Sequence, residues 1–375
     1  MVTLFEPSRI RSLVMKNRTV RSATHEGLAD AEGRVTPELI GVLTALAEGE
    51  VGLIISGHAA VSPVGRASPR QLMVHDDGAI EGLTAMASAV HKAGGVIALQ
   101  IAHAGIFARP PEAWQIPYGP SAADFPEAPH CRALERDEME KVAAQFAAAA
   151  LRGKNAGFDA VQIHAAHTYM LSQFLSPFFN KRTDEYGGSL QNRARLLLQV
   201  VAAVREAVGF DYPVLVKINS EDYLENGFSE DDSLSLSSLL EQAGVDAIEL
   251  SGGSFLPFAA HSPSRKGRVK TAEDELYYRA QAAKIKQRVG IPLMLVGGLH
   301  SLETAQKALS EEIADYLALC RPLICEPDLV RKWRLGLSVK SECISDNLCF
   351  TPLAKQEGVC CVTFARKRGA GAVSR

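Results

Sequence analysis

The sequence lacks the features that place a protein in or across a membrane. No uninterrupted apolar stretch in its 375 residues approaches the roughly 20 residues that span a bilayer. The first residues, MVTLFEPSRIRSLVMKN, contain no continuous apolar segment of the kind found in a signal peptide. We therefore expect a cytoplasmic protein that does not associate with membranes.

Charge of one sign is also missing. The chain has 40 basic and 43 acidic residues, a formal net charge of −3, and the two kinds are interspersed. A nucleic-acid-binding protein would carry a basic face. We therefore expect no nucleic-acid partner and a small-molecule substrate. A homo-oligomer is compatible with this composition, which does not determine the oligomeric state.

Cysteine is sparse outside the end of the chain. Seven cysteines, an odd number, without a secretory signal argue against a disulfide framework. Four of the seven lie within the last 33 residues of the chain: Cys343, Cys349, Cys360 and Cys361.

Apolar residues, by contrast, make up 47% of the chain, enough for a large core. Eight short apolar runs alternate with amphipathic segments. Most runs are continuous, as expected for parallel strands that are buried on both faces. The runs are residues 18–24, 51–57, 95–102, 158–165, 212–219, 245–252, 291–298 and 314–320.

The segments between the runs have helix signals. Thr36 and Pro37 fit the N-cap and first position of a helix, and Ser189 and Ser301 are candidate caps of two others. Eight strand–helix units predict an α/β fold, a single closed (β/α)8 TIM barrel over residues 1–336, followed by a short C-terminal extension over residues 337–375. A doubly wound sheet is the alternative, but the first strand lacks a following G-x-G-x-x-G.

Two long polar side chains lie inside apolar strands. Gln100 is in GVIALQIA and Lys217 is in YPVLVKIN. Burying an amide without a partner costs about 2–7 kcal/mol, and burying an ammonium costs more. Either both side chains bridge to a buried carboxylate, or both face a ligand rich in hydrogen-bond donors and acceptors.

The ends of the last two strands favour a ligand. Gly297 and Gly298 follow the seventh run, and Cys320 and Arg321 follow the eighth, at the corner where barrels often bind phosphate. Together with Gln100 and Lys217, they indicate a phosphorylated cofactor with an amide-bearing ring. FMN has both parts.

The segment IHAAHTYMLSQFLSP (163–177) follows the fourth run and contains His164, His167 and Tyr169. Histidines three residues apart can share a zinc ion on a helix, but no Asp, Glu or Cys stands nearby at ligand spacing. We therefore expect no metal. A structural role is a second alternative. The third is catalytic: imidazoles that donate hydrogen bonds to a carbonyl oxygen, beside a phenol that donates a proton.

A longer segment carries a resemblance. Residues 156–201, AGFDAVQIHAAHTYMLSQFLSPFFNKRTDEYGGSLQNRARLLLQVV, resemble the signature of the old yellow enzyme family of flavin-dependent ene-reductases and NADH:flavin oxidoreductases. LQIAHAG (99–105), VGGL (296–299) and LFEPSRIRSLVMKNR (4–18) are also similar. The bacterial branch, with members resembling 2,4-dienoyl-CoA reductase and xenobiotic reductases, is the most similar part of the family.

The resemblance implies a barrel that binds FMN non-covalently and uses NADH or NADPH as reductant. By matching position, the backbone of Ser22, Ala23 and Thr24 lines the dimethylbenzene or N5 side of the flavin, and Gly57 and His58 lie near O4. Gln100 contacts the pyrimidine ring, and Lys217 lies beside N1 and O2. The phosphate is held by Gly298, Cys320 and Arg321.

The resemblance also implies a substrate site. His164 and His167 match the pair that binds the substrate carbonyl, Tyr169 matches the proton donor, and His25 stands beside flavin and substrate where relatives have Thr or Cys. The implied reaction reduces the activated C=C bond of an α,β-unsaturated carbonyl compound. Thr168 departs from the family's Gly, and positive φ there would strain a threonine.

The C-terminal extension resembles the end of relatives that bind a [4Fe–4S] cluster through C-x2-C-x3-C and a more distant Cys. Here Asp346 replaces the second Cys, and Cys349 is at the wrong spacing for the third. Clusters prefer four thiolates, so we expect none. Zinc held by Cys343, Cys349, Cys360 and Cys361 would lack the usual C-x2-C pair.

Three other functions stay open at this point. One is an FMN-dependent amine dehydrogenase or N-demethylase on the same barrel, for which an aromatic cage would be expected. Another is a flavin-free lyase or aldolase with Lys217 as Schiff-base nucleophile. The last is a non-catalytic flavin-binding electron-transfer protein.

Overall fold

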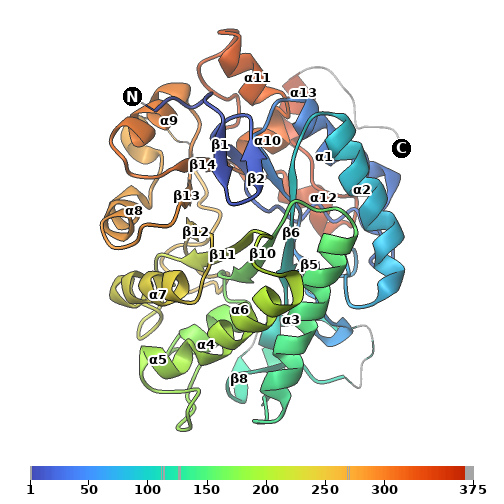
Figure 1. The fold of residues 1–375 in the computed structure, drawn as a ribbon, viewed down its shortest axis with the longest axis vertical. Helices are drawn as coiled ribbons and strands as arrows, with labels where there is room; N and C mark the ends of the chain where they lie inside the picture. The colour runs from blue at the N-terminus through green and yellow to red at the C-terminus, as the bar shows by residue number, and fades with distance from the viewer. Residues whose placement is uncertain are drawn as a thin grey trace.

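A computed structural model describes residues 2–110, 112, 115–125, 128–267, 269 and 271–367. Its centre is a closed barrel of eight parallel strands (Figure 1). The pairing of β10 with β6 and of β14 with β3 closes the barrel. The predicted TIM barrel is confirmed, and each predicted run contains one strand: β3 (Thr19–Arg21), β4 (Leu53–Ile55), β6 (Ile97–Ala102), β10 (Ala160–Ala165), β11 (Val214–Asn219), β12 (Ala247–Ser251), β13 (Leu293–Val296) and β14 (Tyr316–Leu319).

The helices around the barrel bury one apolar stripe each against the strands. In the first, Leu39, Leu43 and Leu46 are buried, and the Thr36 side chain accepts a hydrogen bond from the backbone N–H of Leu39, as a cap does. Ser189 and Ser301 cap their helices in the same way. The main outer helices are α1 (Pro37–Glu48), α2 (Ile80–Lys92), α3 (Glu138–Asn155), α6 (Arg195–Val208), α7 (Glu230–Gln242), α8 (Arg279–Lys286) and α9 (Leu302–Ser310).

Strand register decides which side chains meet inside the barrel. Lys217 is paired with His164 on one neighbouring strand and with Glu249 on the other. Gln162 is paired with Gln100. Alternate residues of a barrel strand point inward, so these polar residues share the upper interior. Apolar residues fill the interior below them, among them Val20, Leu53, Ala98, Ala160, Leu215, Ala247 and Met294.

Short elements surround this frame. An antiparallel hairpin of β1 (Ser8–Ile10) and β2 (Leu13–Met15) packs on the barrel's apolar interior. The loop after the third strand holds a small sheet of β7 (Tyr118–Gly119), β8 (Ala123–Phe125) and β9 (Ala128–Ala133). The rest are β5 (Ala59–Ala60), η1 (Pro63–Gly65), η2 (Asp77–Ala79), η3 (Gly105–Phe107), η4 (Ala272–Asp274), α4 (Met170–Leu175), α5 (Leu190–Arg193), α10 (Arg321–Cys325) and α11 (Leu329–Arg334).

The C-terminal extension returns to the barrel. Its described part holds α12 (Phe350–Ala354) and α13 (Val362–Lys367); residues 368–375 lie outside the described residues. The backbone N–H of Val359 donates to the carbonyl of Glu26 at 2.8 Å, and Arg70 donates to the carbonyl of Gln356 at 2.7 Å. The extension is therefore packed against the loops that follow the first two strands.

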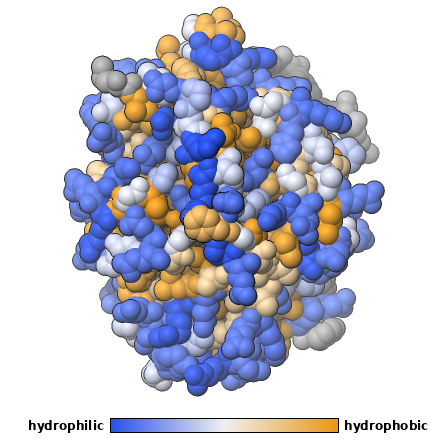
Figure 2. Space-filling model, in the orientation of Figure 1, coloured by the Kyte–Doolittle hydropathy of each residue, from blue (hydrophilic) through white to orange (hydrophobic). Residues whose placement is uncertain are grey.

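The surface mixes polar and apolar residues. Hydrophilic side chains cover most of the face in Figure 2, with apolar side chains scattered between them. Among the described helices, none is long and apolar enough to cross a membrane.

Candidate active site

A cavity of about 480 Å³ lies at the ends of the barrel strands. The structure brings eleven of the predicted site residues together around it: Ser22, Ala23, Thr24, His25, His58, Gln100, His164, His167, Tyr169, Lys217 and Cys320. The other lining residues are Ser251, Phe255, Ser262, Pro263, Ser264, Tyr277, Tyr278, Val296, Gly297, Asn347, Phe350 and Leu353.

Three predicted cofactor residues do not line this cavity. Gly298 and Arg321 line a smaller adjoining cavity of about 60 Å³, which shares Tyr277 and Cys320 with the main one. Gly57 is packed between the first two strands, where a Cβ would lie 2.6 Å from the Thr24 carbonyl oxygen. Glycine is therefore required at position 57, because the loops after the first two strands approach each other closely there.

The corner after the seventh strand needs glycine for two reasons. Gly297 and Gly298 have φ of 145° and 74°, conformations that L side chains rarely adopt. The Tyr277 ring also covers them, since a Cβ at either position would lie within 3.0 Å of a ring atom. The predicted phosphate corner is thus a turn of glycine backbone that lies beneath an aromatic ring.

The two histidines and the tyrosine of the fourth strand converge. The ring centroids of His164 lie 5.3 Å from His167 and 5.1 Å from Tyr169. His167 Nε2 shares a hydrogen bond of 2.7 Å with Ser251 Oγ. His164 Nδ1 is buried and has no partner among the described residues. A buried polar atom of this kind, on the wall of a cavity, fits a ligand that carries its own polar atom.

Burial determines the protonation states of His164, His167 and Tyr169. It lowers the pKa of His164 and His167 well below the ordinary value, and the charge of Lys217 lowers both further. The imidazoles are therefore neutral at pH 7, each with one N–H to donate. Burial raises the pKa of Tyr169 well above its ordinary value, so the phenol keeps its proton.

His58 is the hydrogen-bond partner of Tyr169. The Tyr169 hydroxyl lies 3.0 Å from His58 Nε2. Burial, with the nearby rings of His25 and His164, holds the pKa of His58 well below its ordinary value. The hydrogen bond between the neutral imidazole and the protonated phenol fixes the direction of the tyrosine side chain.

The two residues before Tyr169 have positive φ, the conformation that would strain a threonine at position 168. His167 and Thr168 have φ of 57° and 61°, in the left-handed region that is unfavourable for a β-branched residue. The turn is fixed by Gln173, whose amide donates to the Thr168 carbonyl at 2.5 Å, and by Asn219, which accepts from the His167 N–H at 3.2 Å. The turn directs Tyr169 onto His58.

The buried polar network beneath the cavity contains two residues that the sequence reasoning missed. Gln100 Nε2 donates to Gln162 Oε1 at 2.6 Å, and Gln162 Nε2 donates to Glu249 Oε2 at 2.8 Å. Lys217 Nζ donates to Glu249 Oε1 at 3.0 Å. Gln100 and Lys217 therefore belong to a network around a buried carboxylate and also line the cavity. Each missed residue is a long polar side chain inside a mostly apolar run, the same signal that singled out Gln100 and Lys217.

A model of the NADH:flavin oxidoreductase / NADH oxidase family matches residues 3–340 of the chain. The chain belongs to this family. The old yellow enzyme homologue of Zymomonas mobilis has a similar structure, with a TM-score of 0.78 and 27% identity, over 92% of this chain and 96% of that one.

Two relatives match the same share of this old yellow enzyme family member but differ in their own length. The NADH oxidase of Thermoanaerobacter brockii is 35% identical over 92% of this chain, but the chain spans only 53% of that protein. The 4,4'-dithiodibutanoate disulfide reductase of Rhodococcus erythropolis is 33% identical, and the match covers 92% of both. The chain thus spans about half of the first relative and nearly all of the second.

The C-terminal extension of this family member contributes to the cavity, which no barrel pattern predicts. Asn347, Phe350 and Leu353 line it. The Arg321 guanidinium donates to Asn347 Oδ1 at 2.8 Å, which ties the extension to the corner with Gly298. The extension therefore forms one wall of the cavity, although it lies outside the eight units.

We expect Phe350→Ala and Leu353→Ala to admit bulkier substrates. Each removes an apolar wall of the cavity, and a pocket change of a few methylene groups alters kcat/KM roughly tenfold or more. The measurement compares kcat/KM for N-phenylmaleimide and N-methylmaleimide. Leu348→Ala, an exposed leucine of the same segment that is not in the lining, is the control. An unchanged ratio in both variants would show that the extension does not limit substrate size.

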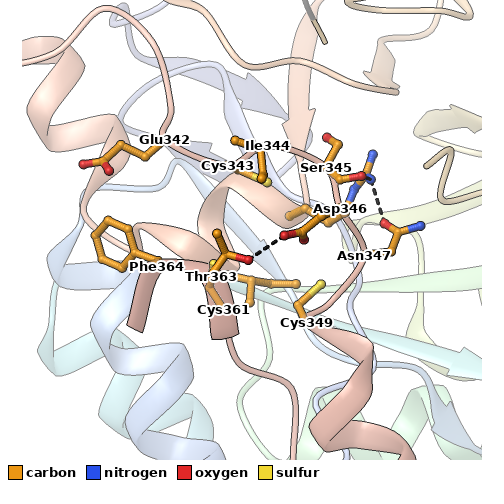
Figure 3. A pocket seen from close by; sticks show the side chains of 12 residues that line it. Glu342, Cys343, Ile344, Ser345, Asp346, Asn347, Cys349, Cys361, Thr363 and Phe364 are labelled. Atoms are coloured by element: carbon orange, nitrogen blue, oxygen red, sulfur yellow. Dashed lines mark hydrogen bonds between the residues drawn. The ribbon is translucent and has the colours of Figure 1, made fainter. Parts of the chain in front are cut away.

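Three cysteines of the extension surround a separate small cavity of about 20 Å³. Figure 3 shows Cys343, Cys349 and Cys361 around it, beside Asp346. The Asp346 carboxylate accepts a hydrogen bond from Thr363 at 2.5 Å. Within the described part of the chain, no group of three or more His, Cys, Asp or Glu side chains could hold a metal ion.

Proposed function

We propose that this protein binds FMN in the 480 Å³ cavity and uses NADH or NADPH to reduce the activated C=C bond of α,β-unsaturated carbonyl compounds. The observation that carries the proposal is the convergence of two neutral imidazoles and a protonated phenol on one cavity wall. The imidazoles are hydrogen-bond donors for an oxygen and the phenol is a proton source for a carbon, and the His164 ring contacts both of the other rings.

The lower part of the cavity fits the flavin ring. The Gln100 amide uses its nitrogen within the protein and has its oxygen left for a ligand, and Lys217 offers a cation at the same level. Gly298 and Arg321, next to Cys320, would hold the phosphate in the adjoining cavity. When bound, FMN supplies the hydride-transfer chemistry between nicotinamide and substrate.

The protein's own side chains would do the rest. His164 and His167 donate hydrogen bonds to the substrate oxygen, whose negative charge grows as hydride reaches the β-carbon. Tyr169 delivers its proton to the α-carbon and is then reprotonated. A phenol whose pKa is raised stays protonated across the physiological pH range and is available as an acid in each cycle.

The charge of the cavity disfavours the amine alternative. Its lining includes the cation Lys217, and no described lining residue is acidic. Tyr277, Tyr278 and Phe255 are aromatic, but no carboxylate in the described lining would pair with a cationic amine, and Glu249 cancels the charge of Lys217 only in part. A neutral or anionic substrate fits this surface better. Membership of a flavin-dependent family, with Lys217 in an ion pair to Glu249, likewise disfavours the aldolase alternative.

Reduction of an organic disulfide is a second candidate. The relative that matches over 92% of both chains is named for a dicarboxylate disulfide, whose negative charge suits this cavity. The balanced reaction joins one disulfide, one NAD(P)H and one proton to give two thiols and NAD(P)+. Here Tyr169 would protonate a leaving thiolate in place of an α-carbon.

We expect the purified protein to be yellow and to bleach when NADH or NADPH is added anaerobically. Reoxidation is then followed with cyclohexenone, a maleimide and 4,4'-dithiodibutanoate, and an N-methylated amine is added separately to the oxidised protein to test whether it bleaches the flavin band. Fast reoxidation by the first two supports the proposal, and reoxidation by the disulfide alone favours the second candidate. A colourless protein that does not take up added FMN, or an aldehyde-dependent imine trapped by borohydride at Lys217, would contradict both.

A further inference from the structure

The carboxylate at the centre of the buried network has no part in the reaction described above. Glu249 lies on β12 and has no exposed surface. It accepts hydrogen bonds from three side chains, those of Ser22, Gln162 and Lys217, at 2.6, 2.8 and 3.0 Å. It does not line the cavity. A fully buried carboxylate beneath a ligand site acts on the ligand through the residues that it holds.

We propose that Glu249 is the positioning residue of the FMN site. It orients the Gln100 amide for the flavin ring and balances the charge of Lys217, and it thereby sets the affinity for FMN and the reduction potential of bound FMN. The inference rests on the proposed FMN binding, but not on the identity of the substrate.

The first effect follows from donor and acceptor chemistry. A carboxylate only accepts, so Gln162 must turn its NH2 group toward Glu249. The oxygen of Gln162 then accepts from the NH2 group of Gln100. The oxygen of Gln100 is left as the acceptor on the cavity side. Without the carboxylate, either glutamine amide could rotate by 180°. The Gln100 amide would then turn its oxygen toward the cavity in some molecules and its NH2 group in others.

The second effect follows from charge. The Lys217 ammonium and the Glu249 carboxylate form an ion pair at 3.0 Å, and their exposed fractions are 3% and 0%. Opposite charges this close cancel much of each other's potential at a third point. FMN gains negative charge on reduction. An unpaired lysine would favour the reduced form strongly, and the paired lysine favours it less, so Glu249 lowers the reduction potential of bound FMN.

The ion pair and the amide relay can be separated by substitution. Glu249→Gln removes the charge and the purely accepting group together. Gln162→Leu breaks the relay but leaves the ion pair in place. Glu326→Gln is the matched control, because Glu326 is also buried and is paired with Lys332 at 3.3 Å, but it lies outside the cavity lining.

The experiment measures the FMN dissociation constant by quenching of flavin fluorescence and the midpoint potential by dye-coupled anaerobic titration. We expect Glu249→Gln to weaken binding of oxidised FMN about tenfold and to raise the potential by ~30 mV, which is a tenfold change in the reduced-to-oxidised ratio for a two-electron couple. Gln162→Leu is expected to weaken binding and leave the potential unchanged. Glu326→Gln should change neither quantity.

The outcomes distinguish the inference from the proposed function. Wild-type protein that takes up no FMN overturns both. Protein that binds FMN but shows the same affinity and potential after Glu249→Gln overturns the inference alone, as does a Glu326→Gln variant that shifts equally. If Glu249→Gln does not fold, the double variant Lys217→Met/Glu249→Gln replaces it. That variant is compared with Lys217→Met, so that the loss of the cation is common to both proteins. We expect the double variant, which also lacks the carboxylate, to have the higher midpoint potential; equal potentials would contradict the proposal.

Discussion

Tyr169→Phe is expected to slow reoxidation of the reduced protein by an enone about 10²- to 10⁴-fold, the usual contribution of a positioned general acid. Reduction by NADH or NADPH should stay within about twofold of wild type, since that half-reaction needs no proton from Tyr169. Removing one oxygen atom leaves the ring in place between His58 and His164. Stopped-flow absorbance of the flavin band measures each half-reaction separately.

The matched control is Tyr186→Phe. Tyr186 is also buried, and its hydroxyl donates to Gln199 at 3.2 Å, but it does not line the cavity. We expect this variant to change neither half-reaction. Equal slowing of reduction and reoxidation in Tyr169→Phe would show that the hydroxyl orders the site as a whole and does not act as the proton donor. With a disulfide as oxidant, the same variant tests protonation of the leaving thiolate.

Lys217→Met is expected to lower the free energy of unfolding by about 3–5 kcal/mol, because it leaves Glu249 buried without its ion-pair partner. FMN retention should fall as well, because the cavity loses its cation. Urea unfolding of the apoprotein measures the first effect, and flavin content after dialysis measures the second.

The double variant separates the two effects of Lys217. Adding Glu249→Gln to Lys217→Met removes the orphaned charge, so we expect most of the stability to return, while FMN binding stays weak. Lys332→Met is the control for loss of a lysine paired with a buried glutamate, and its partly exposed ammonium predicts a smaller loss of stability. If Lys217→Met is as stable as wild type, the Lys217–Glu249 pair does not contribute to stability as the structure indicates.

The strands, the caps and the grouping of His164, His167 and Tyr169 were predictable because each depends on residues close in the chain. Continuous apolar runs mark strands that are buried on both faces, and Thr36, Ser189 and Ser301 act on helices that begin at the next residue. The His164–Tyr169 segment was predictable for a similar reason, because it follows one strand directly and strand ends in a barrel face one mouth.

The partners of Gln100 and Lys217 were not predictable in this way. Gln162 and Glu249 are 87 residues apart in the chain, and their meeting depends on which strands are neighbours and in which register. A bridge to a buried carboxylate and a position on the cavity do not exclude each other for Gln100 and Lys217. One face of the network holds a carboxylate, and the other face borders the cavity.

The sequence by itself determined the eight units, the order of the strands and the chemical groups that each strand end offers, because these follow from local hydrophobic period and from side-chain identity. Only the tertiary structure decided that Glu249 lies beneath the cavity, that His58 holds Tyr169, and that Phe350 and Leu353 form a wall. Those contacts join different strand ends and the extension, at separations of 32 residues for Lys217 and Glu249 and 111 residues for His58 and Tyr169. They form because the barrel brings every strand end to the same mouth.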